Sequence, residues 1–346
     1  MKNKKALVCD ICGKKYRLEF WFRKHVAAHQ KECKANYVLP TVSSISSAAI
    51  DPLEVLPPEL VLRIFSLLDA EDLVHLWEVN RRWRKLVKDP AVWRSAEMNL
   101  GLGVHSECLK VLLRAPCLGR IVFNIEAILT DKMKATLLKT KTKIYRVNGV
   151  LFYSNSDYGW AIRFLKYHGP HLEELSMCYF NEELLNTATT LPSLRRLHIE
   201  MDLSSTCDEA LSEVALKVPV GFTGGLKCFT IEDNRTLPYD FLVSLLSAHS
   251  RTLQEVYMCV GTQVDPEFKW PISCDIVDML LKCQFKALKH LILVRPSDLY
   301  HSLYPESCHM QMAAVSLLLP DVVVTCTICN GEEGKLFKEK NLKMYI

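Results

Sequence analysis

The sequence has no long hydrophobic run. Although 49% of its 346 residues are hydrophobic, no stretch approaches the roughly 18 apolar residues that a membrane-spanning helix needs. Cys9, Asp10 and Cys12 interrupt the basic N-terminus before the apolar core of a signal peptide could form. We therefore expect a soluble protein of the cytoplasm, the nucleus or both, with no membrane partner.

A recognisable catalytic constellation is also lacking. There is no Gly-x-Ser-x-Gly motif, and neither Gly221 nor the Gly224-Gly225 pair is followed by the Lys-Ser/Thr of a phosphate-binding loop. No pair of carboxylates stands out from the charged background. The chain is therefore expected to be a non-catalytic protein.

Disulfides are not expected, although the chain has 14 cysteines. Most of them stand singly in apolar runs, which is typical of buried, reduced thiols. Cys326 and Cys329 have metal-ligand spacing, but no second pair lies nearby, and alternation along an apolar strand would point their thiols to opposite faces. Cys308 is attributed to the start of a helix. No metal is expected at these three positions.

Four residues near the N-terminus do have the spacing of a zinc site, C-x2-C-x12-H-x3-H: Cys9, Cys12, His25 and His29. Residues 1–34 resemble the two-cysteine, two-histidine zinc finger, which implies a small ββα fold that forms together with its Zn²⁺. Cys33, four residues beyond His29, is an alternative ligand.

The partner of this finger is left open between protein and nucleic acid. The first 34 residues carry ten Lys or Arg and three Asp or Glu, a local charge of +7 that leaves −3 for the rest of a +4 chain. Leu18, Trp21 and Lys24 occupy the base-reading positions of the family. Leucine and tryptophan cannot form the bidentate hydrogen bonds by which side chains recognise base edges. A protein contact is favoured. Residues 35–50, with Pro40 and four serines, predict a flexible linker.

Residues 51–98 predict three short helices. Pro57 and Pro58 precede the first helix, and Glu59 stands in its first turn. Apolar residues at helical spacing predict its core face, namely Leu60, Ile64, Leu67 and Leu68. Other apolar residues fall off this stripe, namely Leu56, Val61, Leu62 and Phe65. A unit this small with spare apolar surface is expected to complete its core against a partner.

The order of residues in this stretch resembles the F-box family. The match runs Leu56-Pro57-x-Glu59-Leu60, Ile64-Phe65, Leu68, Asp72-Leu73, Val79, Trp83, Asp89-Pro90 and Trp93-Arg94, with Asn80 where many members carry cysteine. The resemblance implies docking to the Skp-type adaptor of a cullin-based ubiquitin ligase. The residues it implies in docking are Leu56, Pro57, Glu59, Leu60, Ile64, Phe65 and Leu68.

Residues 99–329 predict a solenoid of about eight irregular strand–helix repeats. A Leu-x-x-apolar-x-apolar pattern begins at Leu118, Leu172, Leu194, Leu226, Leu253, Leu288 and Leu319, with a degenerate copy at Ile144, and the starts lie 22 to 35 residues apart. Helical segments lie between the copies. The pattern resembles leucine-rich repeats, which implies parallel strands on a concave face and helices on a convex face. The charged residues 330–346 are expected to form a tail.

The variable positions within the strands are the candidate substrate-binding residues, namely Glu174, Arg196, His198, Lys227, Glu255, Tyr257 and Lys289. The whole chain is therefore interpreted as a multidomain substrate receptor of an SCF-type (Skp–cullin–F-box) ubiquitin ligase, with the adaptor, the cullin and an unknown protein substrate as partners and zinc as cofactor. The alternative is a chromatin- or nucleic-acid-associated regulator that uses the basic finger.

Overall fold

The computed structural model describes residues 7–8, 15–16, 55–101, 105–123, 129–149, 158–178, 181–199, 216, 225–231, 239–260, 273–294 and 305–329. The chain divides into two compact units, Met1–Val55 and Leu56–Ile346. In the first unit, strands β1 (Leu7–Val8) and β2 (Lys15–Tyr16) pair antiparallel.

The second unit begins with a helical region of four short helices. These are α2 (Pro58–Phe65), α3 (Ala70–Val79), α4 (Arg81–Leu86) and α5 (Pro90–Trp93). Side-chain caps separate them: Asp69, Asn80 and Asp89 accept hydrogen bonds from the backbone N–H groups of Asp72, Trp83 and Ala91. Each cap satisfies a donor that the helix start would otherwise leave unpaired.

The core face predicted for α2 is wrong. Val61 and Phe65 are the buried residues of this helix, whereas Leu60, Ile64 and Leu67 are exposed. The Phe65 ring packs against Trp83, with 5.4 Å between ring centroids. Because α2 has apolar residues on two sides, helical spacing alone could not tell which side faces the core.

Nine parallel strands form one sheet whose strands follow chain order from β3 to β11. They are β3 (Glu97–Leu100), β4 (Cys117–Phe123), β5 (Lys143–Gly149), β6 (Glu174–Met177), β7 (Arg196–Ile199), β8 (Cys228–Ile231), β9 (Glu255–Cys259), β10 (His290–Val294) and β11 (Val323–Cys326). The predicted parallel α/β sheet is confirmed, and each predicted repeat contains a strand. The sequence pattern missed β3.

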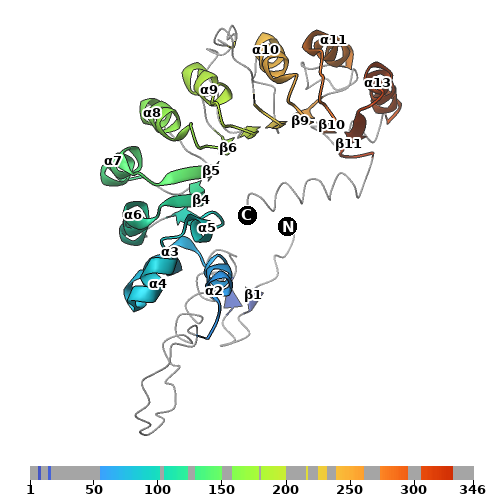
Figure 1. Cartoon of the computed structure of the whole chain (residues 1–346). Helices are drawn as coiled ribbons and strands as arrows, with labels where there is room; N and C mark the ends of the chain where they lie inside the picture. The colour runs from blue at the N-terminus through green and yellow to red at the C-terminus, as the bar shows by residue number, and fades with distance from the viewer. Residues whose placement is uncertain are drawn as a thin grey trace, which may run out of the picture. The chain divides into compact units, whose positions relative to one another are not determined.

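The helices of the sheet follow their strands along the chain. They are α6 (His105–Arg114), α7 (Asp131–Lys139), α8 (Tyr158–His168), α9 (Glu182–Thr189), α10 (Tyr239–His249), α11 (Ser273–Cys283) and α13 (Pro305–Leu318). In Figure 1 they line the outer side of the curved unit and the strands line its inner side. None of the helices in the described ranges has the length and apolar character that crossing a membrane requires.

Apolar residues that are aligned in neighbouring strands form the core between the sheet and the helices. Four of these residues are almost fully buried and stand side by side, namely Leu175, Leu197, Phe229 and Val256.

Successive repeats are also connected by histidines at the ends of helices. His168 Nε2 lies 2.8 Å from the carbonyl oxygen of Leu137 in the preceding helix. Each repeat therefore buries its apolar face only with its neighbours, as in a solenoid.

Candidate partner-binding surfaces

The outer side of α2 is an exposed apolar face. Leu60, Ile64 and Leu67 are 47%, 40% and 81% exposed. Leu60 and Ile64, four residues apart, lie on one side of α2, next to the side that buries Val61 and Phe65, and Leu67 stands in the turn that follows the helix. We call Leu60, Ile64 and Leu67 the α2 face. A cluster of large apolar side chains held in water on a rigid helix is suited to binding another protein.

The other predicted docking residues surround this face in different ways. Pro57 and Glu59 are exposed, whereas Leu56 and Leu68 are half-buried. The carbonyl oxygen of Leu56 accepts a hydrogen bond from Arg82 Nη2 at 3.4 Å. Phe65 is only 2% exposed. As placed here, Phe65 supports the α2 face from inside rather than offering its ring to a partner.

The helical region is packed directly onto the first strands of the sheet. Trp93 is fully buried, and its indole N–H donates to the carbonyl oxygen of Val87 at 2.6 Å. Gly119 in β4 lies so close to the Arg94 carbonyl that a Cβ there would overlap it. Ser95 Oγ donates to the carbonyl of Ser66, just beyond α2. These contacts fix the orientation of the α2 face relative to the strands.

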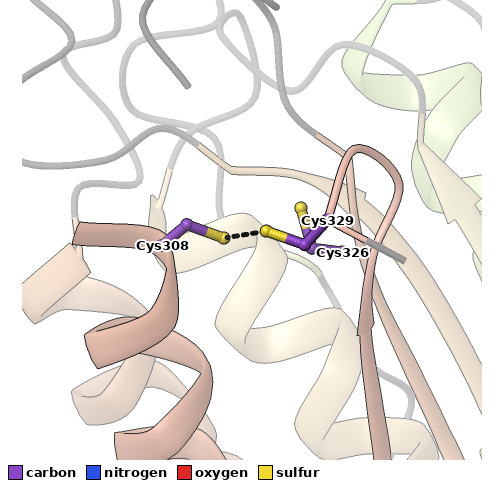
Figure 2. A group of neighbouring side chains, drawn as sticks. All are labelled: Cys308, Cys326 and Cys329. Carbon is purple, nitrogen blue, oxygen red and sulfur yellow. Dashed lines mark hydrogen bonds between the residues drawn. The ribbon is translucent and has the colours of Figure 1, made fainter. Parts of the chain in front are cut away.

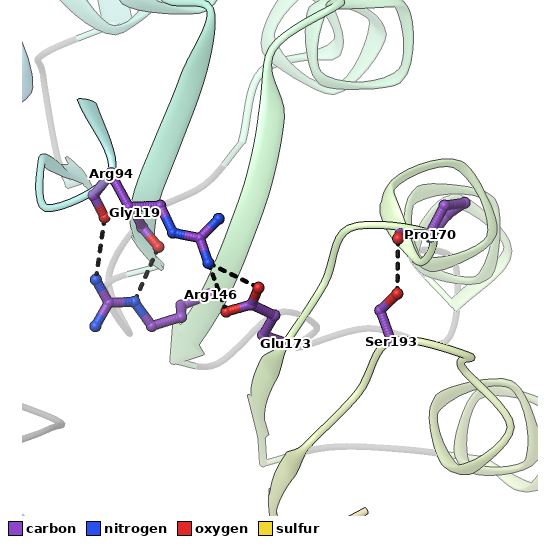
Figure 3. A network of polar contacts seen from close by, with 6 residues as sticks. All are labelled: Arg94, Gly119, Arg146, Pro170, Glu173 and Ser193. Atoms are coloured by element: carbon purple, nitrogen blue, oxygen red, sulfur yellow. Dashed lines mark hydrogen bonds and ion pairs between the residues drawn. The ribbon is translucent and has the colours of Figure 1, made fainter. Parts of the chain in front are cut away.

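A polar network extends this junction across three strands. Figure 3 shows Arg94 reaching the Glu173 carboxylate, with Nη2 to oxygen distances of 2.8 and 3.0 Å. The Arg94 guanidinium also lies 3.5 Å from the ring centroid of Tyr145. Arg146 donates from Nε to the Gly119 carbonyl at 3.0 Å, and burial lowers the pKa of its guanidinium. The network adds polar contacts between the end of α5 and the start of β6.

The candidate substrate-binding residues fall in three rows across the sheet. One row holds Glu174, Arg196 and Glu255, the row two residues further along holds His198 and Tyr257, and Lys227 and Lys289 directly precede β8 and β10. Glu174 and Arg196 are paired in register, with Arg196 Nε 3.7 Å from the Glu174 carboxylate. Lys227 and Lys289 are exposed and Glu255 is half-buried. His198 and Tyr257 are each 6% exposed, and burial lowers the pKa of His198 to about 4. As placed, these two have little access to a partner, so the substrate hypothesis depends on the other five.

Three cysteines that sequence analysis set aside come together at the last repeat (Figure 2). Cys308, Cys326 and Cys329 have sulfur atoms within 4.8 Å of one another. The expectation that Cys326 and Cys329 point apart is wrong, because β11 ends at Cys326 and a turn follows. The arrangement could hold a metal ion. By contrast, Cys9, Cys12, His25 and His29 lie outside the described residues.

A small helical region with an exposed apolar face thus leads directly into a parallel strand–helix sheet. Residues 53–98 match the family described as F-box-like. The chain therefore contains an F-box-like domain, and it includes α2 to α5 and the start of β3.

Curated relatives are similar to part of the chain. The probable E3 ubiquitin ligase complex SCF subunit sconB of Aspergillus clavatus is 36% identical over 92 residues, and sconB of Neosartorya fischeri gives the same values. Each match covers 25% of this chain and 13% of the relative. An F-box protein of Saccharomyces cerevisiae is 42% identical over 59 residues, 16% of this chain and 9% of that protein. The chain thus spans only a small fraction of these relatives.

Proposed function

We propose that the chain is a substrate receptor of an SCF-type ubiquitin ligase, acting in the cytoplasm or nucleus. The observation that carries the proposal is the exposed α2 face inside a region that matches the F-box-like family. The similarity to the sconB proteins, which are described as probable SCF subunits, supports it. The α2 face, with Leu56 and Pro57 at its start, binds the Skp-type adaptor, which links the chain to a cullin.

The mechanism is proximity rather than catalysis by this chain. A receptor holds its substrate near the ubiquitin-charged enzyme and so raises the effective concentration of substrate lysines there. Such a device works best when the docking and substrate surfaces keep a fixed orientation. The buried Trp93, the close approach at Gly119 and the Arg94–Glu173 contacts support this requirement.

The strand–helix sheet is the substrate-binding part in this proposal. Its repeats are irregular leucine-rich repeats within residues 99–329, with strands on the concave side. The candidate contacts are the accessible strand residues, namely Glu174, Arg196, Lys227, Glu255 and Lys289. Their mixed charges suit a protein surface better than a nucleic-acid backbone, which calls for uniformly positive charge.

The N-terminal segment adds a second contact in this proposal. Residues 1–34 form a zinc finger with Cys9, Cys12, His25 and His29 as ligands, joined by the linker 35–50 to the F-box-like domain. Its charge of +7 is the one observation that favours the alternative function, a nucleic-acid-associated regulator. Electrostatic binding to DNA would weaken steeply with salt, whereas apolar protein contacts would not.

Capture of a purified Skp-type adaptor tests the proposal. The informative variant is Leu60→Glu combined with Ile64→Glu, and the control is Leu113→Glu, which charges another exposed leucine (77% exposed) on α6. Two apolar contacts worth about 1.5 kcal/mol or more each predict at least a hundredfold loss of affinity in the double variant. Leu113→Glu should bind as the wild type does. No binding by the folded wild type, or equal binding by all three proteins, contradicts the proposal.

A further inference from the structure

The last repeat contains a cluster of three thiols from two elements. Cys308 stands in the first turn of α13, Cys326 is the last residue of β11, and Cys329 lies in the turn after β11. The Cys308 and Cys329 sulfur atoms are 3.7 Å apart, and all three lie within 4.8 Å of one another (Figure 2). Among the residues that the structure describes, this is the one such group of potential metal ligands.

The spacing of the sulfur atoms matches a shared ion. In a tetrahedral Zn²⁺ site with Zn–S bonds of about 2.3 Å, two sulfurs lie roughly 3.8 Å apart. A disulfide would require about 2.05 Å. The 3.7 Å between the Cys308 and Cys329 sulfurs is close to the first value, and the Cys326 sulfur lies within 4.8 Å of both.

The surroundings also favour a thiolate site. Cys308 lies at the N-terminal turn of a 14-residue helix, where the helix dipole favours negative charge on its sulfur. Cys308 and Cys326 are fully buried, whereas Cys329 is exposed. Solvent can therefore reach the cluster from the side of Cys329. An ion held by three sulfurs there keeps a fourth position open to water, and three thiolates select a soft or borderline ion.

We propose that Cys308, Cys326 and Cys329 bind Zn²⁺ and that the ion fastens the last repeat. On binding, the three thiols release their protons to solvent and form three Zn–S bonds, with no change of oxidation state. The ion joins the start of α13 to the end of β11. That location matters because, among the strands that the structure describes, β11 is the last of the sheet, pairs with β10 alone and exposes Val323. Terminal repeats of a solenoid need such a cap. This site does not depend on the proposed receptor function.

Zinc content of the full chain tests this proposal in a background that removes the expected finger ligands, Cys9→Ser with Cys12→Ser. The purified background protein, kept reduced, should retain one zinc per chain by native mass spectrometry. Adding Cys329→Ser should remove that ion, and because Cys329 is exposed, this change should not prevent folding. Adding Cys259→Ser is the matched control, since Cys259 is a buried cysteine that ends β9 as Cys326 ends β11. The control should keep its zinc.

Two further readouts make the result specific. Co²⁺ added to the zinc-free background protein should give thiolate charge-transfer absorption that Cys329→Ser abolishes and Cys259→Ser preserves. Zinc should slow hydrogen exchange in peptides from α13 and β11, with no change in β6 to β8. A folded, reduced background protein without zinc overturns the proposal. So does equal zinc loss in both cysteine variants, or a Cys308–Cys329 disulfide in the protein as purified from the cytosol.

Discussion

The two ends of the nine-stranded sheet are built differently. At one end β3 continues directly from the F-box-like domain, and Met98 and Leu100 are fully buried. At the other end β11 has one neighbour among the described strands, with Val323 54% exposed and Val324 half-buried. One end is covered by a folded domain, whereas in the described residues the other is covered by little beyond α13.

This difference gives the F-box-like domain a structural role besides the docking that we propose for it. The end repeats of a solenoid each lack a neighbour on one side. At β3 the missing neighbour is supplied by the helices, which present the α2 face outward and bury Val61 and Phe65 inward. The proposed docking surface and the cap are therefore parts of one domain, and damage to the junction should affect both.

The largest expected effect comes from breaking the covered end. Trp93→Ala removes a fully buried side chain together with its hydrogen bond to Val87. It should lower the free energy of unfolding by about 3–5 kcal/mol. Val323→Ala at the open end should cost only about 0.5 kcal/mol. Urea unfolding measures both, and equal losses would contradict the difference between the ends.

Acid should weaken the middle of the sheet rather than its ends. Burial lowers the pKa of His198 and of His249 to about 4, against about 6.5 in the unfolded chain. Well above pH 6.5 each histidine is neutral in both the folded and the unfolded state, so its titration does not affect stability. Between pH 6.5 and 4 the unfolded state binds protons that the folded state does not, so each histidine costs up to about 1.4 kcal/mol per pH unit.

Denaturant unfolding at a series of pH values measures this loss. Because His249 Nε2 lies 3.2 Å from the carbonyl oxygen of Thr189, His249→Gln can keep a hydrogen-bonding group there while removing the titration. The variant should show a shallower fall in stability with acid. An unchanged slope in His249→Gln would show that its titration is not part of the effect.

The tight junction at Gly119 predicts a moderate effect. A methyl group there would overlap the Arg94 carbonyl, so backbone must shift, and Gly119→Ala should cost about 1–3 kcal/mol. Gly159 in α8 is the matched control, because no atom lies within 4 Å of the position of its Cβ. Gly159→Ala should be neutral or stabilise by up to about 1 kcal/mol. The midpoint of thermal unfolding should fall in Gly119→Ala and stay the same or rise in Gly159→Ala. Equal midpoints would contradict the close approach at Gly119.

The smallest expected effect concerns the ion pair at the junction. Arg94 and Glu173 are 50% and 42% exposed, so Glu173→Gln should cost less than about 1 kcal/mol. Glu183→Gln is the control, because the Lys166–Glu183 pair is longer, at 3.9 Å, and more exposed. Its loss should be close to zero. If Glu183→Gln lowered the free energy of unfolding as much as Glu173→Gln, the Arg94–Glu173 contact would stabilise the fold no more than an ordinary exposed ion pair.

Much of the sheet follows from the sequence because its signals are local. The recurring leucine pattern marked a strand in each repeat, and helices such as α10 (Tyr239–His249) lie between the copies as predicted. The parallel arrangement follows from strands alternating with helices. By contrast, β3 carries no Leu-x-x-apolar-x-apolar pattern, and its pairing with β4 depends on the packing of the preceding helices.

The errors concern features that local patterns do not determine. The α2 helix is apolar on two sides, so only the packing of Phe65 on Trp83 distinguishes its inner face. Arg94 and Glu173 meet across 79 residues of sequence. Cys308 reaches the other two thiols only because α13 packs beside β11 and a turn reverses the chain after Cys326. A signal was present in the Cys-x-x-Cys spacing, but its third partner was fixed by tertiary structure.

Hydrogen exchange of the full chain with and without a purified Skp-type adaptor tests the central claim most directly. The account predicts that the adaptor slows exchange in peptides covering residues 55–68, which include the α2 face, and leaves those of α6 and β6 to β9 unchanged. No protection of residues 55–68 at adaptor concentrations that saturate a known F-box protein, or protection confined to the strands, would contradict the assignment of the F-box-like domain as the docking surface.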